Sequence, residues 1–337
     1  MIKNILKPLS FILIPALAGA VACKKSGAHA VGRAEVPEMA MIELYNYSPA
    51  SELEERMGKM PDRLLEIYRQ MDGRKDYAAY EPSKADKALV VKYLRLLPPV
   101  FERVFREKCV GLYFVRGFAG NGMTSWVVDA KGRLYFHMVL NPDALKNDLS
   151  ATLTEREKSC FLPVPGGRVS VNAGKKYKGL AYALFHEGSH AVDYIYRVTP
   201  FVEPDFPERY RPPVPRSGNV FTRAWRNYSL PKPENDYRLR GKITFYGLGG
   251  GPKLAFSEAP ELYRGLAGSP FVSLYGSKSW AEDFAELAAF DMITRTLGQP
   301  YKITLSVPVA RPLVFEPMRS SKALIRAEKL MKRLESL

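Results

Sequence analysis

The chain has 337 residues, of which 46% are hydrophobic and 25% charged, and its formal net charge is +15. This composition is typical of a globular protein with a packed core, and the length suits one large domain or two ordinary ones. The basic charge favours anionic partners, but the absence of a basic helix or an aromatic RNA-binding signature disfavours nucleic acid.

The N-terminal segment has the pattern of an export signal. Lys3 and Lys7 precede an apolar run over residues 9–22 that is short for a membrane span. The run ends in the small residues AGAVAC, which resembles a bacterial lipoprotein signal in which Cys23 is lipidated and becomes the first mature residue. The sequence therefore predicts export to the cell envelope, with the protein lipid-anchored at the membrane surface or in the periplasm. Two alternatives stay open: ordinary signal cleavage after AHA (28–30), and an uncleaved N-terminal anchor.

Export also bears on the other cysteines. If Cys23 carries lipid, Cys109 and Cys160 remain as an even pair in an oxidising compartment. A disulfide between them and two buried free thiols are both compatible with the sequence. Removal of residues 1–23 takes away two lysines and lowers the formal charge from +15 to +13, so the mature chain stays basic.

A tether and three helices are predicted next. Residues 24–50 are small, polar and irregular, and we interpret them as a tether. The helical patterns after it cover residues 51–71, ending at Asp72-Gly73; residues 83–97, opened by a Ser83 cap; and residues 100–108, after Pro98-Pro99.

Strand patterns follow the helices. Residues 110–117 and 124–141 are rich in β-branched and aromatic residues, with a hairpin turn at AKG (130–132), and residues 168–172 form a further short strand. We expect these strands to form one small sheet. The strand pair at 124–140 would offer an edge on which an extended peptide can dock.

Helices and irregular segments make up the rest of the chain. A long buried helix is predicted over Lys178–Arg197, another over Trp280–Leu297, and an amphipathic one from Ser320. Between the first two of these helices, at about 198–272, lies an irregular segment that we interpret as an insertion.

The insertion contains two irregular stretches. Residues 200–215 hold six prolines and cannot be a regular helix or a central strand. GLGGGP (247–252) lacks the strand–helix context and the Lys-Ser/Thr ending of a phosphate loop. We interpret the first as a surface loop and the second as a flexible loop that is a candidate lid.

The stretch HEGSH, residues 186–190, carries the clearest chemistry. Its spacing places His186 and His190 on one face of a helix, one turn apart, as two ligands of a tetrahedral zinc require. Glu187 lies beside that face and can take a proton from a metal-bound water. The alternative is a helix whose histidines only make core hydrogen bonds, but in so apolar a helix these groups would be costly without partners.

A catalytic zinc needs a third protein ligand. His29 lies in the tether and His137 in a distant strand, so the third ligand should be a carboxylate. Glu282 and Glu286 lie four apart on a predicted helix, where like charges repel each other. A zinc ion on one and a ligand-histidine N–H on the other would remove that conflict. Glu282 also fits a capping box with Ser279, which is a purely structural alternative.

Two stretches together resemble the catalytic domain of anthrax lethal factor and related gluzincin zinc metallopeptidases. That family combines H-E-x-x-H-A-x-D with a downstream Y-G and an E-x-F-A-E that begins seven residues after the tyrosine. This chain has HEGSHAVD at 186–193, YG at 275–276 and EDFAE at 282–286, with the same seven-residue step. The segment between the two stretches is longer than the family leads us to expect, so substrate preference does not transfer.

The resemblance implies the zinc ligands. His186, His190 and Glu282 would bind one Zn²⁺ per chain. Within the insertion, Glu258 and Glu261 are rival third ligands, which we rank below Glu282.

The resemblance also implies catalytic and supporting roles. Glu187 would be the general base, and Tyr275 would donate a hydrogen bond to the oxyanion, its alternative being a packed loop tyrosine. Glu286 and Asp193 would orient the ligand histidines. For Asp193, which shares a helical face with His190, the alternative is a solvated helix charge.

These observations predict an α+β protein. A zincin-like metallopeptidase domain would cover residues 51–337, with a helical N-terminal part, a small mixed sheet packed on the H-E-x-x-H helix, and the insertion. The predicted function is that of a zinc-dependent endopeptidase acting on protein or peptide substrates. The alternatives are a zinc-dependent peptidoglycan peptide or amide hydrolase and a catalytically silent surface-binding lipoprotein.

Overall fold

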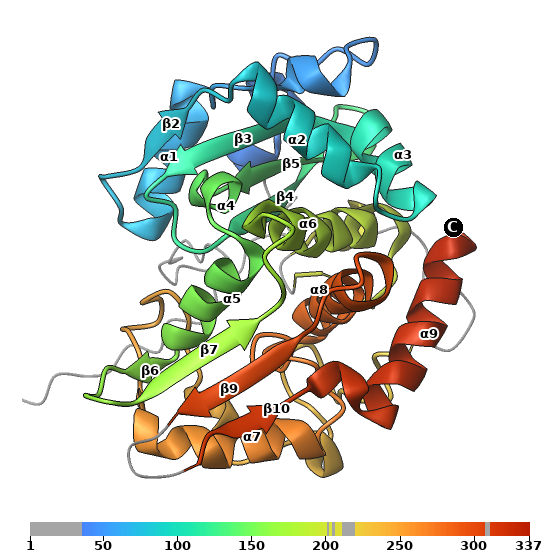
Figure 1. Cartoon of the computed structure of the whole chain (residues 1–337). Helices are drawn as coiled ribbons and strands as arrows, with labels where there is room; N and C mark the ends of the chain where they lie inside the picture. Colours follow the sequence, from blue (N-terminus) through green and yellow to red (C-terminus); the bar gives the residue numbers. More distant parts are fainter. Residues whose placement is uncertain (1–35, 201, 204–205, 211–219, 307–310) are drawn as a thin grey trace, which may run out of the picture.

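The computed structural model describes residues 36–200, 202–203, 206–210, 220–306 and 311–337 (Figure 1). The predicted signal segment, Cys23 and the first part of the predicted tether lie outside the described residues. Among the helices that are described, none has both the length and the apolar character needed to cross a membrane.

A mixed five-stranded sheet forms the upper layer in Figure 1. Its order is β1-β3-β5-β4, with β2 also paired to β3, and its strands are β1 (Met57–Gly58), β2 (Ala78–Tyr80), β3 (Cys109–Arg116), β4 (Gly122–Val128) and β5 (Leu134–Leu140). β3 and β5 run parallel, while β4 and β5 form the antiparallel hairpin predicted from the sequence. β4 is the last strand of this order. Among the described residues, one isolated β-bridge involves β4, between its last residue Val128 and Met41.

Three helices lie beside this sheet: α1 (Asp62–Asp72), α2 (Lys84–Leu94) and α3 (Pro99–Lys108). The predicted starts of α2 and α3 and the end of α1 are confirmed, since Ser83 caps α2 and Gly73 ends α1 in a left-handed conformation. The predicted helix over 51–71 is wrong in its first half. Residues 53–56 form only a 3-10 turn, because the chain then pairs with β3 as β1 and Pro61 supplies no N–H to continue a helix from there.

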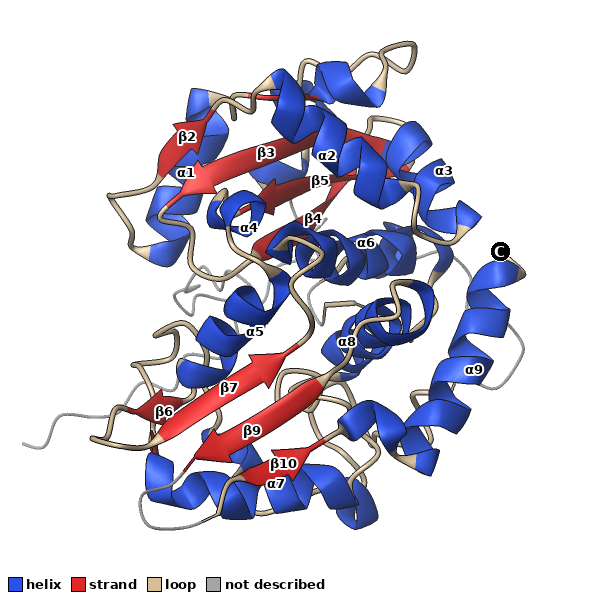
Figure 2. Ribbon diagram, viewed as in Figure 1, coloured by secondary structure: helices blue, strands red, loops and turns tan. Residues whose placement is uncertain are grey.

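The central helix of the molecule is α6 (Gly179–Tyr196). It packs against β4 and β5 on one side and against α8 (Trp280–Asp291) on the other, with α5 (Leu149–Lys158) also in contact (Figure 2). The prediction of a buried helix is confirmed, because every residue up to Tyr194 is buried. Its polar side chains must therefore find partners on neighbouring elements rather than in water.

The lower half of the molecule contains two more sheets. One has the order β10-β9-β7, with β7 (Arg168–Asn172), β9 (Lys302–Ser306) and β10 (Leu313–Phe315); the other pairs β6 (Phe161–Leu162) with β8 (Leu254–Ala255). The expectation of a single sheet over 110–172 is therefore wrong. β7 is a strand as predicted, but its partner is β9, which the sequence pattern did not identify.

Four helices complete the described fold: α4 (Asp143–Lys146), α5, α7 (Ala259–Gly268) and α9 (Ser321–Glu335). The amphipathic helix predicted from Ser320 is confirmed. The helix predicted to reach Leu297 instead ends at Asp291 and continues as a π turn over Met292–Thr296.

Residues 36–50 are packed rather than extended as a tether. Tyr45 is buried, and its hydroxyl lies 2.8 Å from Nδ1 of His137, a strand residue that is fully buried. The Tyr68 hydroxyl lies 2.8 Å from Nε2 of the same ring. Burial lowers the pKa of His137 to about 3, so its imidazole is neutral at ordinary pH. His137 therefore joins the N-terminal segment to the sheet.

Both cysteines among the described residues are free thiols. Cys109 and Cys160 are fully buried, in line with the second of the two alternatives left open by the sequence. Burial raises the pKa of the Cys109 thiol to about 12, which keeps it protonated and unreactive.

Candidate metal centre

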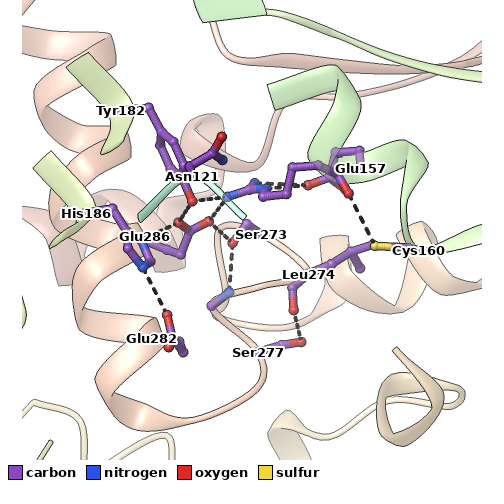
Figure 3. A network of polar contacts seen from close by, with 12 residues as sticks. Asn121, Glu157, Cys160, Tyr182, His186, Ser273, Leu274, Ser277, Glu282 and Glu286 are labelled. Atoms are coloured by element: carbon purple, nitrogen blue, oxygen red, sulfur yellow. Dashed lines mark hydrogen bonds and ion pairs between the residues drawn. The ribbon is translucent and has the colours of Figure 1, made fainter. Parts of the chain in front are cut away.

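Three potential ligand atoms meet between α6 and α8. His186 and His190 lie one turn apart on α6, and Glu282 lies on the first turn of α8. Figure 3 shows the contact between His186 and Glu282. Nε2 of His186 lies 3.2 Å from Nε2 of His190 and 3.1 Å from Oε2 of Glu282. The remaining distance, from Nε2 of His190 to Oε2 of Glu282, is 3.5 Å. The structure therefore brings together the three residues that the sequence singled out as metal ligands.

These separations match the edges of a zinc coordination tetrahedron. Ligands placed about 2.0–2.1 Å from a zinc ion at tetrahedral angles lie about 3.3–3.4 Å from one another. The observed edges of 3.1, 3.2 and 3.5 Å bracket that value. These three atoms could therefore supply one face of a zinc tetrahedron, and a catalytic zinc keeps its fourth position for a water or a substrate oxygen.

The bonding around these atoms also favours a cation. Nδ1 of His186 lies 2.8 Å from Oε1 of Glu286, so with a metal bound this nitrogen would carry the proton and Nε2 would offer its lone pair to the metal. Oε2 of Glu282 is buried and meets no group among the described residues other than the two imidazole nitrogens, at 3.1 and 3.5 Å. These two nitrogens and the carboxylate oxygen need a positive charge between them, either a proton or a metal ion.

Protons and a metal compete for this site. Burial alone lowers the pKa of His186, but interactions with the Glu282 and Glu286 carboxylates outweigh burial and raise that pKa to about 10. The same histidines hold the pKa of Glu282 well below its usual range, against burial, which raises it. Metal binding here must therefore release protons and strengthen as the pH rises.

Glu187 is held beside the ligand atoms by the edge strand β4. Its Oε2 lies 2.9 Å from Oγ1 of Thr124, which is also 3.0 Å from the Glu187 carbonyl oxygen. Burial raises the pKa of Glu187, while the two neighbouring histidines lower it by a smaller amount. A raised pKa brings the carboxylate closer to the pH at which a general base works best. The side chain needs Gly122 as its neighbour, because a Cβ there would lie 2.8 Å from Cγ of Glu187.

Tyr275 lies against the first ligand histidine. Its ring centroid is 5.5 Å from that of His186, and Phe245 of the insertion packs edge-on against its other side at 4.8 Å. Burial raises the pKa of Tyr275 well above its usual range, so the phenol stays protonated and able to donate. The next residue, Gly276, lies close to α8, because a Cβ at this position would be 3.1 Å from Cβ of Glu286. The absence of a side chain at Gly276 therefore allows this close approach.

Glu286 makes the contact with a ligand histidine that the resemblance implies. Its Oε1 lies 2.8 Å from Nδ1 of His186 and accepts a hydrogen bond from Tyr182 at 2.6 Å (Figure 3). Its Oε2 accepts from Ser273 at 2.5 Å and from Arg156 at 2.7 Å. The carboxylate is fully buried, and every oxygen is satisfied.

Asp193 does not orient His190, contrary to the expectation from the sequence. Its Oδ1 accepts from the backbone N–H of Thr199 at 2.7 Å, and its Oδ2 accepts from the Thr199 hydroxyl. Nδ1 of His190 has no hydrogen-bond partner among the described residues. The chain turns back at the end of α6, where Arg197 adopts a left-handed conformation, and this turn brings Thr199 onto the carboxylate. Asp193 is also not solvated, since it is 2% exposed.

The rival roles of the acidic residues can be compared directly. Oγ of Ser279 accepts from the backbone N–H of Glu282, which is half of a capping box, but the Glu282 carboxylate turns to the histidines instead of back to the cap. Glu258 accepts from the backbone N–H of Ala255, and Glu261 forms an exposed ion pair with Arg238. Neither of the rival glutamates belongs to the candidate metal group.

Four residues of this centre were not identified from the sequence: Thr124, Arg156, Tyr182 and Ser273. Tyr182 lies one turn before His186 on a helix already assigned, so its position on the same face was an available signal. The other three come from separate elements, and their residue types are too common to single them out.

Comparison of the chain with protein-family models, curated proteins and solved structures finds no match. The chemistry of the site therefore rests on its own geometry.

Proposed function

We propose that this chain is a zinc-dependent endopeptidase with a zincin-like fold, similar to the gluzincins. The observation that carries the proposal is the set of three ligand atoms at tetrahedral separations, with the Glu187 carboxylate directly beside them. A histidine pair that only packs the core has no need of a carboxylate facing both imidazoles and a second carboxylate on the other nitrogen of one ring.

The residues divide the chemistry between them. A zinc ion at such a site supplies a water of lowered pKa and polarises the substrate carbonyl. Glu187, held by Thr124, takes up the proton released from the nucleophile and passes it to the departing amine. The Tyr275 phenol donates a hydrogen bond to the oxygen on which negative charge develops. Glu286 keeps the His186 ring in one tautomer and orientation.

The edge of β4 supports an extended peptide as the substrate. β4 ends the order of its sheet, and Thr124 and Gly122 place this strand against Glu187. An extended chain added to this edge would gain main-chain hydrogen bonds and run past the metal centre. Export and lipid attachment through Cys23 belong to the same proposal and rest on the sequence pattern alone.

The proposal is tested by metal analysis combined with hydrolysis assays on the full chain. We expect about one zinc per chain, and cleavage of an unfolded protein that a chelator abolishes and added zinc restores. Release of stem peptides from purified cell wall, without cleavage of unfolded protein, would instead support a peptidoglycan hydrolase. Bound zinc with no turnover of any peptide or wall substrate would leave a silent surface-binding lipoprotein.

Tyr275→Phe is expected to lower kcat by roughly 10²–10³-fold and to leave zinc content unchanged, because only the donor to the oxyanion is removed. Tyr246→Phe is a matched control. It also loses a half-buried phenol near the site, but that hydroxyl accepts from Asn121 at 2.8 Å. An unchanged rate in Tyr275→Phe would make this tyrosine a packing residue only.

A further inference from the structure

A buried arginine lies behind the metal centre. Arg156, near the end of α5, is fully buried and bonds two fully buried carboxylates, Glu286 and Glu157. Nη1 donates to Oε2 of Glu286 at 2.7 Å, and Nη2 donates to Oε1 of Glu157 at 2.9 Å. Nη1 also lies 2.5 Å from the Tyr182 hydroxyl. Among the described residues, this guanidinium is the only permanently charged cation bonded to Glu286.

The two oxygens of Glu286 have different tasks. Oε1 faces Nδ1 of His186 and the Tyr182 hydroxyl, whereas Oε2 is held by Arg156 and Ser273. The hydrogen bonds from Arg156 and Ser273 to Oε2 fix the plane of the carboxylate, and this plane determines where Oε1 points. A ligand histidine is oriented by the acceptor on its other nitrogen, so the geometry of His186 depends on what holds Glu286.

We propose that Arg156 is a positioning residue of the metal centre, acting through Glu286 on His186. The inference rests on the proposed zinc site. Arg156 touches neither a ligand atom nor the reacting atoms. It neutralises the buried Glu286 carboxylate and is one of the two donors that hold its Oε2, the other being Ser273.

The surroundings of Arg156 suit an arginine and not a lysine. Its planar guanidinium bonds the two carboxylates from different edges, and Glu157 is itself held by the Tyr263 hydroxyl. The guanidinium carbon Cζ also lies over the rings of Tyr182 and Phe290, at 5.0 and 5.6 Å from their centroids. A lysine offers one point charge and cannot make both contacts in this fixed arrangement.

The test is a double-mutant cycle on zinc affinity, measured by chelator competition on the full chain. Arg156→Met and Glu286→Gln are each expected to weaken zinc binding by about 10–100-fold. If Arg156 acts through Glu286, the double variant should bind zinc no more weakly than Glu286→Gln alone. Arg156→Lys should fall between the unaltered chain and Arg156→Met, and should have no effect in the Glu286→Gln background.

Glu157→Gln is the matched control, because it disturbs the same buried network on the side away from His186. We expect a lower thermal midpoint with zinc affinity within about twofold of the unaltered chain. If Arg156→Met fails to fold, Arg156→Lys in the two backgrounds gives the same comparison.

The outcomes separate this inference from the proposed function. Additive losses in the cycle, or an equal loss in Glu157→Gln, would overturn the positioning role while the zinc site itself stands. No zinc binding by the unaltered chain would instead remove the proposed function. Hydrolysis need not be measured in either case.

Discussion

Glu187→Gln is expected to bind zinc as tightly as the unaltered chain and to lose hydrolysis by roughly 10²–10⁴-fold. Glutamine has the same shape, and its amide oxygen can still accept from the Thr124 hydroxyl that holds Glu187 now. The glutamine amide, however, cannot take up the proton released from the nucleophilic water. Zinc content and steady-state hydrolysis of an unfolded protein, measured on the same preparation, give both quantities.

Two results would contradict this assignment. Turnover at the unaltered rate would remove Glu187 from the mechanism. Glu187 is not one of the three candidate ligands. Loss of zinc together with activity would therefore mean that its carboxylate supports the metal centre rather than the proton transfer.

Glu282→Ala is expected to weaken zinc binding by more than about 100-fold, beyond the 10–100-fold typical of residues that only support a ligand. The substitution removes one of three protein ligands. It leaves the start of α8 intact, because Ser279 bonds to the backbone N–H of residue 282 and not to its side chain. Metal retained after dialysis against a weak chelator measures the loss.

Glu258→Ala is the control for this experiment. Glu258 was one of the two rival ligands from the sequence, but in the structure it bonds to the backbone of Ala255 and pairs with Lys242. We expect normal zinc content in this variant. The reverse pattern, with zinc lost only in Glu258→Ala, would move the metal site to the insertion.

The candidate metal-binding group could be predicted from the sequence because each part of it is local. The spacing of His186 and His190 fixes their shared helical face, and Glu282 follows a Ser cap on a second helix. Their meeting in space was implied by the resemblance to a known family. Capping signals were equally local, and Ser83 and Gly73 act as expected.

The supporting contacts could not be predicted because they join distant parts of the chain. Arg156 meets Glu286 across 130 positions, and Thr124 meets Glu187 across 63. The sheet around β7 was assigned wrongly for the same reason, since its partner β9 lies far downstream. Asp193 was assigned wrongly for a local reason. It shares a helical face with His190, but the backbone turn at Arg197 brings Thr199 close enough to donate to its carboxylate instead.

Three acidic side chains of α8, Glu282, Asp283 and Glu286, contact different parts of the chain, although Glu282 and Glu286 share His186. Glu282 faces the ligand histidines, and Glu286 bonds to α5 and α6. Asp283, between them, accepts from Trp225 of the insertion and from Arg326 of α9. Four segments of the chain are therefore fastened to two turns of one helix. We therefore expect local opening of the insertion or of α9 to disturb the candidate metal centre, and these segments to unfold together with α8 as one cooperative unit.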